Sequence, residues 1–309
     1  MIMKRIPVVS ILLLVFNMNM PAQFFNTKEE LIYYTSEWTG ERFDDGRPKV
    51  PDGILDRMKK VSIEEAWGIL RSKGYNNQFE AGWKMIHQEG VIVGRALTAQ
   101  YFPLRPEIAD RITGDGQSQG RVGAMNSWPI DVLVKGDVYV ADCFGKIIDG
   151  TLIGDNLGNA IYANSGNGVV FDAGARDLEG LSEIEGFNAF VRGFDPSYLR
   201  ETMLMGINVP VRIGRATVFP GDVVLAKQTG VLFIPAHLAE EVVTRAEFIM
   251  VRDMFGHEML KKGIYTPGQI DGRWSDDIKE AFLEWTKKNA GNLPMSKEDL
   301  EEYLRERTW

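Results

Sequence analysis

One segment, residues 154–177, restricts the possible fold of this chain more than any other. It opens with a glycine turn at Asp155, continues through a stretch that predicts a helix over residues 157–164, and closes with the adjacent pair Arg176 and Asp177. A second glycine turn and a short apolar run separate the helix from that pair, and the run predicts a buried strand. A loop–helix–strand–loop unit of this length can return both loops to one edge of a sheet.

Two carboxylates and a guanidinium would then converge on one small pocket. Such a set suits a divalent cation and a developing oxyanion. The alternative is that Asp155 caps a helix and that Arg176 and Asp177 form a surface ion pair. A bare Arg-Asp dipeptide would favour this alternative. The twenty residues, 156–175, between Asp155 and Arg176 favour the pocket.

This spaced pattern resembles the RraA-like family. That family includes metal-dependent 4-hydroxy-4-methyl-2-oxoglutarate / 4-carboxy-4-hydroxy-2-oxoadipate aldolases and also proteins that regulate ribonuclease activity by binding. Its aldolases carry an Asp, twenty further residues and then Arg-Asp, which here are Asp155, Arg176 and Asp177. Non-aldolase members tend to lack the first Asp. The resemblance covers about half of the chain and includes three further segments, Gly94–Thr98, Lys135–Asp142 and Phe219–Pro235.

The resemblance implies an α/β fold, the swivelling β/β/α layered domain of the RraA-like type, assembled as a homotrimer or homohexamer. We expect helical N- and C-terminal extensions around this domain. The predicted organisation is a signal peptide over residues 1–22, an N-terminal extension over 23–88, an RraA-like catalytic domain over 89–250 and a helical C-terminal extension over 251–309.

The resemblance also implies a divalent-metal-dependent class II aldolase or lyase. It would cleave a 4-hydroxy-2-oxo acid to pyruvate through a metal-stabilised enolate, with oxaloacetate decarboxylation as a side activity. Asp177 would bind the metal, Mg²⁺ or Mn²⁺, because a hard cation prefers oxygen ligands. Arg176 would hold the oxo-acid oxygens, and Asp155 would polarise a water that takes the hydroxyl proton. The substrate carboxylate would meet backbone N–H groups at a helix N-terminus, in Gly154, Asn156 and Leu157.

In the family's aldolases an acidic residue from a neighbouring subunit helps to hold the waters on the metal. Asp253 is the best match here, and a solvated helix carboxylate is an equally weighted alternative. The chain departs from the family pattern in two places. Residues Asp172–Gly174 replace the usual Asp-Gly before Arg-Asp, and a family Asp is replaced in the region of Lys227 and Gln228.

The N-terminus has the order of a secretory signal. Lys4 and Arg5 precede an apolar run, Ile6–Phe16, and a cleavage site follows at about Ala22. The run is too short to span a bilayer comfortably, and the alternative is a buried N-terminal helix. We therefore expect a secreted or periplasmic protein without stable membrane insertion after processing.

Charge and cysteine content exclude several other classes. The net charge is −8 and no dense Lys/Arg run occurs, so a nucleic-acid partner held through phosphates is not favoured. The single cysteine, Cys143, follows a strand-like run and predicts a buried structural thiol, and it rules out a cysteine zinc site. The three histidines are scattered and show no metal-ligand spacing.

Hydrophobic periodicity and capping signals predict the remaining elements. A capping box at Ser62 predicts a helix through about Ser72, with a second capping signal at Ser296 and further helices over Phe24–Thr39 and Ala239–Met250. One face of the helix after Ser62 would carry Ile63, Ala66, Trp67 and Leu70. Strands are predicted over Val91–Val93, Ala96–Ala99, Val138–Ala141, Val169–Phe171, Val223–Ala226 and Val231–Ile234.

Three functions are compatible with these features. The first is the metal-dependent aldolase, favoured by the complete set of Asp155, Arg176 and Asp177. The second is an exported lyase or hydratase that acts on a sugar-derived acid with the same metal site, favoured by the predicted export and the extensions. The third is a non-catalytic RraA-like binding or regulatory protein, which the presence of Asp155 disfavours.

Overall fold

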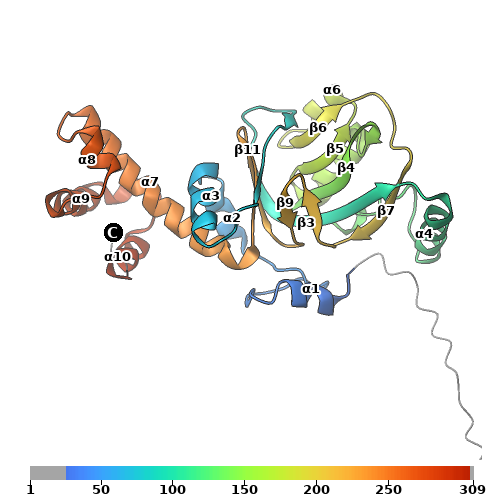
Figure 1. Cartoon of the computed structure of the whole chain (residues 1–309), viewed down its shortest axis with the longest axis horizontal. Helices are drawn as coiled ribbons and strands as arrows, with labels where there is room; N and C mark the ends of the chain where they lie inside the picture. The colour runs from blue at the N-terminus through green and yellow to red at the C-terminus, as the bar shows by residue number, and fades with distance from the viewer. Residues whose placement is uncertain (1–25, 307–309) are drawn as a thin grey trace, which may run out of the picture.

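The computed structural model describes residues 26–306, so the predicted signal peptide lies outside the described residues. A mixed β-sheet forms the body, helices cover it, and a helical arm extends to one side (Figure 1). The sheet strands are β1 (Phe79–Glu80), β2 (Lys84–Met85), β3 (Ile92–Pro103), β4 (Asp137–Thr151), β5 (Val169–Ala175), β6 (Ala189–Phe194), β7 (Thr202–Ile207), β10 (Val223–Lys227) and β11 (Gly230–Ile234). A separate hairpin consists of β8 (Val211–Ile213) and β9 (Ala216–Val218).

The helices lie at the ends of the chain and in the crossovers between strands. They are α1 (Lys28–Tyr34), α2 (Asp52–Met58), α3 (Ile63–Ser72), α4 (Pro106–Ser118), α5 (Asp155–Ser165), α6 (Leu178–Ser182), α7 (Ala239–Lys261), α8 (Pro267–Asp271), α9 (Asp276–Asn289) and α10 (Lys297–Glu306). Short 3₁₀ helices are η1 (Ile130–Val132), η2 (Ala236–Leu238) and η3 (Ala290–Asn292). The predicted α/β class with helical extensions is confirmed.

Within the described residues the sheet has nine strands in the order β1-β11-β10-β3-β4-β5-β6-β2, and β7 pairs with the outer part of β3. Strands β3, β4, β5 and β6 are mutually parallel, so their carboxyl ends meet at one edge. Alternate side chains enter two different cores, as the pleat requires. Tyr139 and Ala141 pack on the side of α5, whereas Val138 and Val140 pack on the side of the β8–β9 hairpin.

The loop–helix–strand–loop unit of residues 154–177 forms as predicted, with a longer helix and a longer strand. The helix begins at Asp155 and ends at Ser165, before Gly166 in the left-handed conformation at φ +65°. The strand runs over Val169–Ala175 and is buried except at Asp172. Because β4 and β5 are parallel neighbours joined through α5, both loops that follow these strands lie at the same sheet edge.

The N-terminal helix differs from its prediction. It spans Lys28–Tyr34 rather than Phe24–Thr39, and the start of the predicted range lies outside the described residues. The Arg42 guanidinium stabilises the loop after this helix, since it donates to the carbonyl oxygens of Thr35 at 2.7 Å and Trp38 at 3.0 Å. The Thr35 carbonyl oxygen also accepts the Trp38 N–H at 3.0 Å, so the chain leaves the helix through a tight turn whose carbonyl oxygens Arg42 caps.

The helix after Ser62 is confirmed with its capping box, but one member of its predicted face is wrong. Ile63, Ala66 and Leu70 are buried, whereas Trp67 is 38% exposed. Ile69 is the additional buried residue of this helix. Trp67 instead lies over the Arg71 guanidinium, 4.8 Å from the ring centroid.

The C-terminal arm has an apolar core of its own. Helix α7 starts against α2 and α3 and runs away from the sheet to meet α8, α9 and α10 (Figure 1). Aromatic side chains dominate the arm, with Phe255 in contact with Trp274, Phe282 and Trp285. The last helix begins at Lys297, where Ser296 accepts a hydrogen bond from the Asp299 N–H. No helix within residues 26–306 has the length and apolarity to cross a bilayer.

Candidate functional site

The structure brings the two loops of the motif into contact at the carboxyl edge of the sheet. Asp155 is the first residue of α5 and follows β4 after a short link of residues 152–154, and Arg176 and Asp177 directly follow β5. The Arg176 N–H donates to the Ile153 carbonyl oxygen at 3.0 Å, which ties the second loop to the first. The three charged residues of the motif therefore share one short stretch of sheet edge.

Gly154 makes the close approach possible. A Cβ atom at this position would lie 2.2 Å from Asp177 Oδ2, closer than a real Cβ contact, and 3.2 Å from Arg176 Nε, which is a tight contact. Gly180 plays the same part on the other side, since a Cβ there would lie 2.8 Å from the Asp155 Cβ. Two glycines thus leave the space in which the acidic side chains lie.

Asp177 holds a backbone conformation that few residues other than glycine adopt. Its φ and ψ angles are +56° and +46°, in the left-handed region, and it directly precedes the short helix α6. Aspartate is among the residues that tolerate this region, and non-glycine residues there often occur at functional sites. The conformation places the carboxylate over Gly154, with Oδ2 3.3 Å from Arg176 Nη1.

Both partners of this ion pair remain accessible. The Arg176 side chain is 32% exposed and the Asp177 side chain is 38% exposed. An ion pair of such exposure contributes little to stability, because water screens it. The charges are therefore available to a ligand at small cost to the fold.

Tyr198 is a site residue that the sequence did not reveal. The Arg176 guanidinium lies 4.8 Å from the centroid of its ring, and Tyr198 is 59% exposed. Tyr198 lies in the loop between β6 and β7, which is fastened to β4 through Ser197. The Asp149 N–H donates to Ser197 Oγ at 2.7 Å, and Thr151 Oγ1 donates to the Ser197 carbonyl oxygen at 2.5 Å. No local pattern signals such a contact between distant loops.

The predicted backbone donors at the start of α5 are partly occupied. Asp155 Oδ1 accepts the Asn156 N–H at 2.8 Å, so that N–H is engaged within the chain. Leu157 is half-buried and packs against the apolar core below α5. Gly154 is buried under the Asp177 carboxylate.

Asp253 lies elsewhere in the chain. It is exposed on α7 and lines a cavity of about 440 Å³ with residues of α8, among them Asp271. Figure 1 shows the outer part of α7 and α8 on the far side of the molecule from α6. A single chain therefore does not bring Asp253 to the motif, and its predicted arrival from a neighbouring subunit stays a prediction.

The donors at the motif suit a hard cation with a largely aqueous shell. Within residues 26–306 no group of three or more Asp, Glu, His or Cys side chains is arranged to hold a metal. Mg²⁺ is commonly bound through only one or two carboxylates and keeps several waters. The exposed Asp177 carboxylate above Gly154 fits that mode.

Cys143 offers no soft ligand and no nucleophile. It is fully buried in the core on the α5 side of the sheet, as predicted. Burial raises the pKa of its thiol to about 12, so the thiolate is absent near neutral pH.

Comparison with known proteins defines the class. The RraA-like family profile, described as Aldolase/RraA, matches residues 53–233, which is more than half of the chain. The chain therefore belongs to the RraA-like family, and its fold is the RraA-like fold expected from the motif.

The relatives are distant. The chain is 29% identical over 163 residues to the protein DlpA of Legionella pneumophila, covering 52% of this chain and 24% of DlpA. It is 30% identical over 112 residues to a putative 4-hydroxy-4-methyl-2-oxoglutarate aldolase of Halalkalibacterium halodurans, covering 36% of this chain and 52% of the relative. The match thus spans about a quarter to a half of these relatives. The solved structure of an uncharacterized protein from Pseudomonas syringae superposes with a TM-score of 0.60 at 25% identity, covering 76% of this chain and 99% of that one.

Proposed function

We propose that this protein is a divalent-metal-dependent carbon–carbon lyase that cleaves a 4-hydroxy-2-oxo acid to pyruvate. The observation that carries the proposal is the meeting of Asp155, Arg176 and Asp177 around Gly154 at the carboxyl edge of parallel strands. Open α/β sheets bind ligands at this edge. Membership of a family that includes aldolases, and a distant relative named as a putative aldolase, support it.

Arg176 is the group that holds the substrate. Its planar guanidinium can donate two parallel hydrogen bonds to the oxo and carboxylate oxygens of a 2-oxo acid. Tyr198 supports one face of the guanidinium and thereby limits its motion. As the C3–C4 bond breaks, its electron pair moves toward the 2-oxo oxygen, where the positive charge of Arg176 offsets the developing negative charge.

Asp155 is the group that moves the proton. Its carboxylate, held by the Asn156 N–H, would orient a water that removes the C4 hydroxyl proton as the new carbonyl forms. The same water can then return a proton to C3, which completes pyruvate. The reaction needs no oxidant, and every proton and electron pair remains among substrate, water and Asp155.

Asp177, with Asp155 nearby, would hold the Mg²⁺ or Mn²⁺ ion. When bound, such an ion supplies Lewis-acid stabilisation of charge on the oxo-acid oxygens. Asp177 also pairs with Arg176, so its carboxylate fixes the guanidinium and the cation site relative to each other. Decarboxylation of oxaloacetate places the same charge on the same oxygens, so we expect it as a side activity.

The proposal includes a location and an assembly. The order of charged, apolar and small residues at the N-terminus supports export to the periplasm or the medium. N-terminal sequencing of the mature protein would test this by locating a cut at about Ala22. A homotrimer or homohexamer is proposed from family membership, and light scattering on the purified protein would measure it.

The decisive experiment measures pyruvate release from 4-hydroxy-4-methyl-2-oxoglutarate and from oxaloacetate. It compares Mg²⁺, Mn²⁺ and EDTA, and compares the wild type with Asp177→Ala. A matched control is Glu201→Ala, because Glu201 shares the left-handed backbone of Asp177 but lies outside the motif. Metal-dependent release that Asp177→Ala abolishes and Glu201→Ala preserves would support the proposal.

Two results would contradict it. If the folded protein binds metal but releases no pyruvate, the site serves another reaction, such as a lyase or hydratase step on a sugar-derived acid. If it neither binds metal nor releases pyruvate, a binding or regulatory role in this family becomes the better description.

A further inference from the structure

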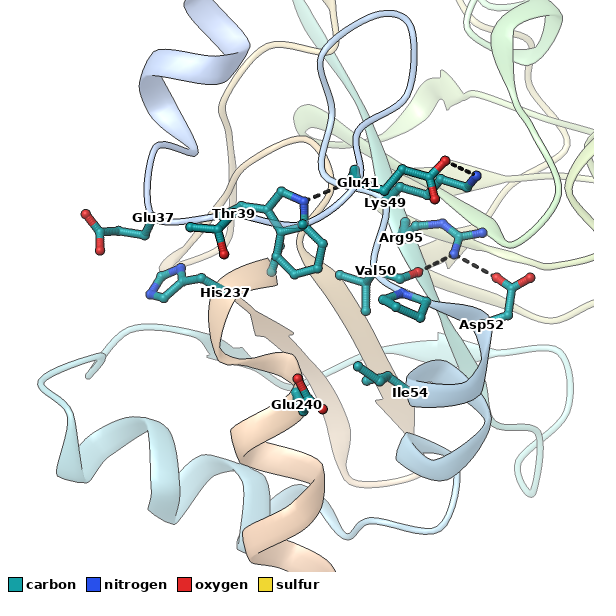
Figure 2. A pocket seen from close by; sticks show the side chains of 14 residues that line it. Glu37, Thr39, Glu41, Lys49, Val50, Asp52, Ile54, Arg95, His237 and Glu240 are labelled. Atoms are coloured by element: carbon teal, nitrogen blue, oxygen red, sulfur yellow. Dashed lines mark hydrogen bonds and ion pairs between the residues drawn. The ribbon is translucent and has the colours of Figure 1, made fainter.

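A cavity of about 350 Å³ lies at the edge of the sheet opposite the aldolase motif. Its walls come from α1 and the loop after it, the loop after α3, β9 with the segment that follows, and the start of η2. A neighbouring cavity of about 520 Å³ shares Glu37 and His237 with it, and Figure 2 shows these two residues at one end, away from Arg95 and Asp52. Small-molecule sites in proteins commonly have volumes of about 300–1,000 Å³.

This cavity is separate from the aldolase motif. Asp222, in its wall, directly precedes β10, and the first residue of β10 pairs with Arg95 near the start of β3. On the other side Arg95 pairs with Asp137 at the amino end of β4, whereas Asp155 follows the carboxyl end of that strand. Figure 1 shows α1 and α6 on opposite sides of the sheet. A ligand in the cavity would therefore not contact the motif.

Aromatic side chains from four separate segments form much of the wall: Tyr34, Trp38, Tyr75 and Phe219. The ring centroids of Tyr34 and Phe219 lie 5.7 Å apart, with the planes at 33°. Trp38 Nε1–H donates to the Glu41 carbonyl oxygen at 2.8 Å, and a Cβ atom at Gly40 would lie 2.5 Å from the indole ring. The hydrogen bond and the contact with Gly40 thus fix the indole. The face of an aromatic ring carries partial negative charge and attracts a cation.

The charged side chains of the wall are acidic. Glu37 is exposed and has no ion-pair partner among residues 26–306. Asp222 is 4% exposed, and its Oδ2 accepts the Phe219 N–H at 2.8 Å. Burial lowers the pKa of His237, so its imidazole adds no positive charge near neutral pH. No lysine or arginine occurs among the described residues that line the cavity, so an anionic ligand would meet only like charge.

The buried and half-buried hydrogen-bond donors of the wall are already used within the chain. Gln78 Nε2 donates to two carbonyl oxygens, at 3.2 Å and 3.0 Å. The Thr35 hydroxyl donates to a carbonyl oxygen one turn earlier in α1 at 2.6 Å, and the Tyr75 hydroxyl lies 3.3 Å from His237 Nε2. A sugar or a carboxylate needs free donors, so this wall suits neither. The aromatic faces and the acidic charge remain for a ligand.

From this arrangement we propose that the cavity binds a quaternary ammonium group, a cation whose charge is spread over apolar methyl groups. Such a group forms no conventional hydrogen bond and therefore needs none of the occupied donors. Its methyl groups pack against the rings, and the ring faces together with Glu37 attract its charge. A primary ammonium fits less well, because its three N–H donors each need an acceptor that the rings do not supply.

Isothermal titration calorimetry on the full chain tests the proposal. The probes are tetramethylammonium and choline, compared with ethanolamine and with the uncharged analogue of choline in which carbon replaces nitrogen. We expect saturable binding of choline, at least about tenfold tighter than binding of the uncharged analogue or of ethanolamine. Burial raises the pKa of Asp222 to about 7, so titrations at pH 8 keep this carboxyl ionised beside the ligand.

Substitutions then separate the rings from the acidic charge. Trp38→Ala should weaken choline binding about three- to tenfold and Trp38→Phe less, because phenylalanine keeps a smaller aromatic face. Glu37→Gln and Asp222→Asn should each weaken it about two- to threefold, because each removes one negative charge. The matched controls are Trp67→Ala and Glu29→Gln, which change a partly exposed tryptophan and an exposed glutamate outside the cavity. Both should bind choline as the wild type does, and thermal unfolding confirms that each variant is folded.

A second assay identifies the source of the ammonium group, which occurs both in free solutes and in the headgroup of phosphatidylcholine. Cosedimentation with phosphatidylcholine vesicles that free choline displaces would identify the lipid, whereas choline binding without cosedimentation would identify a solute, and both support the proposal. The proposal is overturned if choline does not bind saturably up to about 10 mM. It is also overturned if the uncharged analogue or ethanolamine binds as tightly as choline, or if Trp38→Ala and Trp67→Ala behave alike.

Discussion

Two Arg–Asp pairs at opposite edges of the same sheet show how one kind of ion pair serves two purposes. At the amino edge Arg47 and Asp137 are 1% and 0% exposed, and Arg47 also donates to Asp45 at 2.8 Å. At the carboxyl edge Arg176 and Asp177 are 32% and 38% exposed and are joined by one 3.3 Å contact. The first pair fastens the N-terminal extension to β4, and the second pair leaves its charges open to a ligand.

The difference teaches that burial and the number of partners, not residue type, separate an ion pair that stabilises the fold from one whose charges stay accessible. A buried charge needs a counter-charge, because an uncompensated one costs several kcal/mol. A half-exposed charge has little effect on the fold, so its position can be set by the chemistry it performs. The strained backbone of Asp177 is consistent with this second role.

The largest effect is expected for Arg47→Met, which tests whether the buried pair stabilises the fold. Removal of the guanidinium leaves Asp137 buried without its counter-charge, so we expect a loss of about 3–5 kcal/mol in the free energy of unfolding. Denaturant titration measures it. Oxaloacetate decarboxylation by the folded fraction should be unchanged, and Arg47→Met combined with Asp137→Asn should recover part of the stability. A loss below about 1 kcal/mol would show that the pair does not fasten the extension.

The converse is expected for Asp177→Asn. Asparagine tolerates the left-handed backbone as well as aspartate does, so the melting temperature should hardly change. Loss of the negative charge should lower kcat/KM for oxaloacetate about 10²–10³-fold, because it affects both the cation site and the position of Arg176. Steady-state kinetics with Mg²⁺ and thermal melting test the two halves. Retained activity, or a large fall in stability, would place Asp177 with the structural pair.

Asp222 is a buried carboxyl without a paired arginine among residues 26–306, and it tests how burial alone changes stability with pH. Burial raises the pKa of Asp222 to about 7, against about 3.9 in an unfolded chain. The folded state therefore binds this proton more tightly, so the stabilisation is present below about pH 4 and is lost as pH rises to about 7. Relative to the wild type, Asp222→Asn should gain about 2 kcal/mol in unfolding free energy between pH 5 and pH 8.

Urea titrations at the two pH values measure this change. The control is Asp276→Asn, whose side chain is 95% exposed and should show no such difference. An equal response of both variants would mean that Asp222 titrates like a surface carboxyl. That result would also contradict the explanation that Asp222 is tolerated in the interior because it binds a proton there.

The smallest effect is expected at the exposed pair of Arg176 and Asp177. Tyr198→Ala removes the ring beside Arg176, and an exposed cation–π contact contributes about 0.5–1 kcal/mol. We expect kcat/KM to fall about two- to fivefold, mainly through KM, while Tyr198→Phe keeps the wild-type value. Initial-rate kinetics on oxaloacetate would show this. An equal loss in Tyr198→Phe would mean that the hydroxyl rather than the ring matters, and a loss confined to kcat would mean that Tyr198 does not act through substrate binding.

Local elements were predictable where the signal lies within a few residues. The capping box at Ser62, the strand at Val169–Phe171 and the helix after Asp155 all form, because each depends on short-range hydrogen bonds or on hydrophobic periodicity. The predictions were wrong where a side chain outside the local pattern competed with it. A tight turn capped by Arg42 follows α1 directly, and Trp67 is exposed beside Arg71.

The sequence by itself determined the RraA-like α/β class and the spaced motif of Asp155, Arg176 and Asp177, because parallel strands joined by one helix return their loops to a common edge. Only the tertiary structure decided which Arg–Asp pair is buried, that Tyr198 supports Arg176, and that a cavity forms beside Trp38. Those features depend on contacts between segments far apart in the chain. Burial and partner geometry are set by the packing of all such segments together, and no local pattern of residues encodes them.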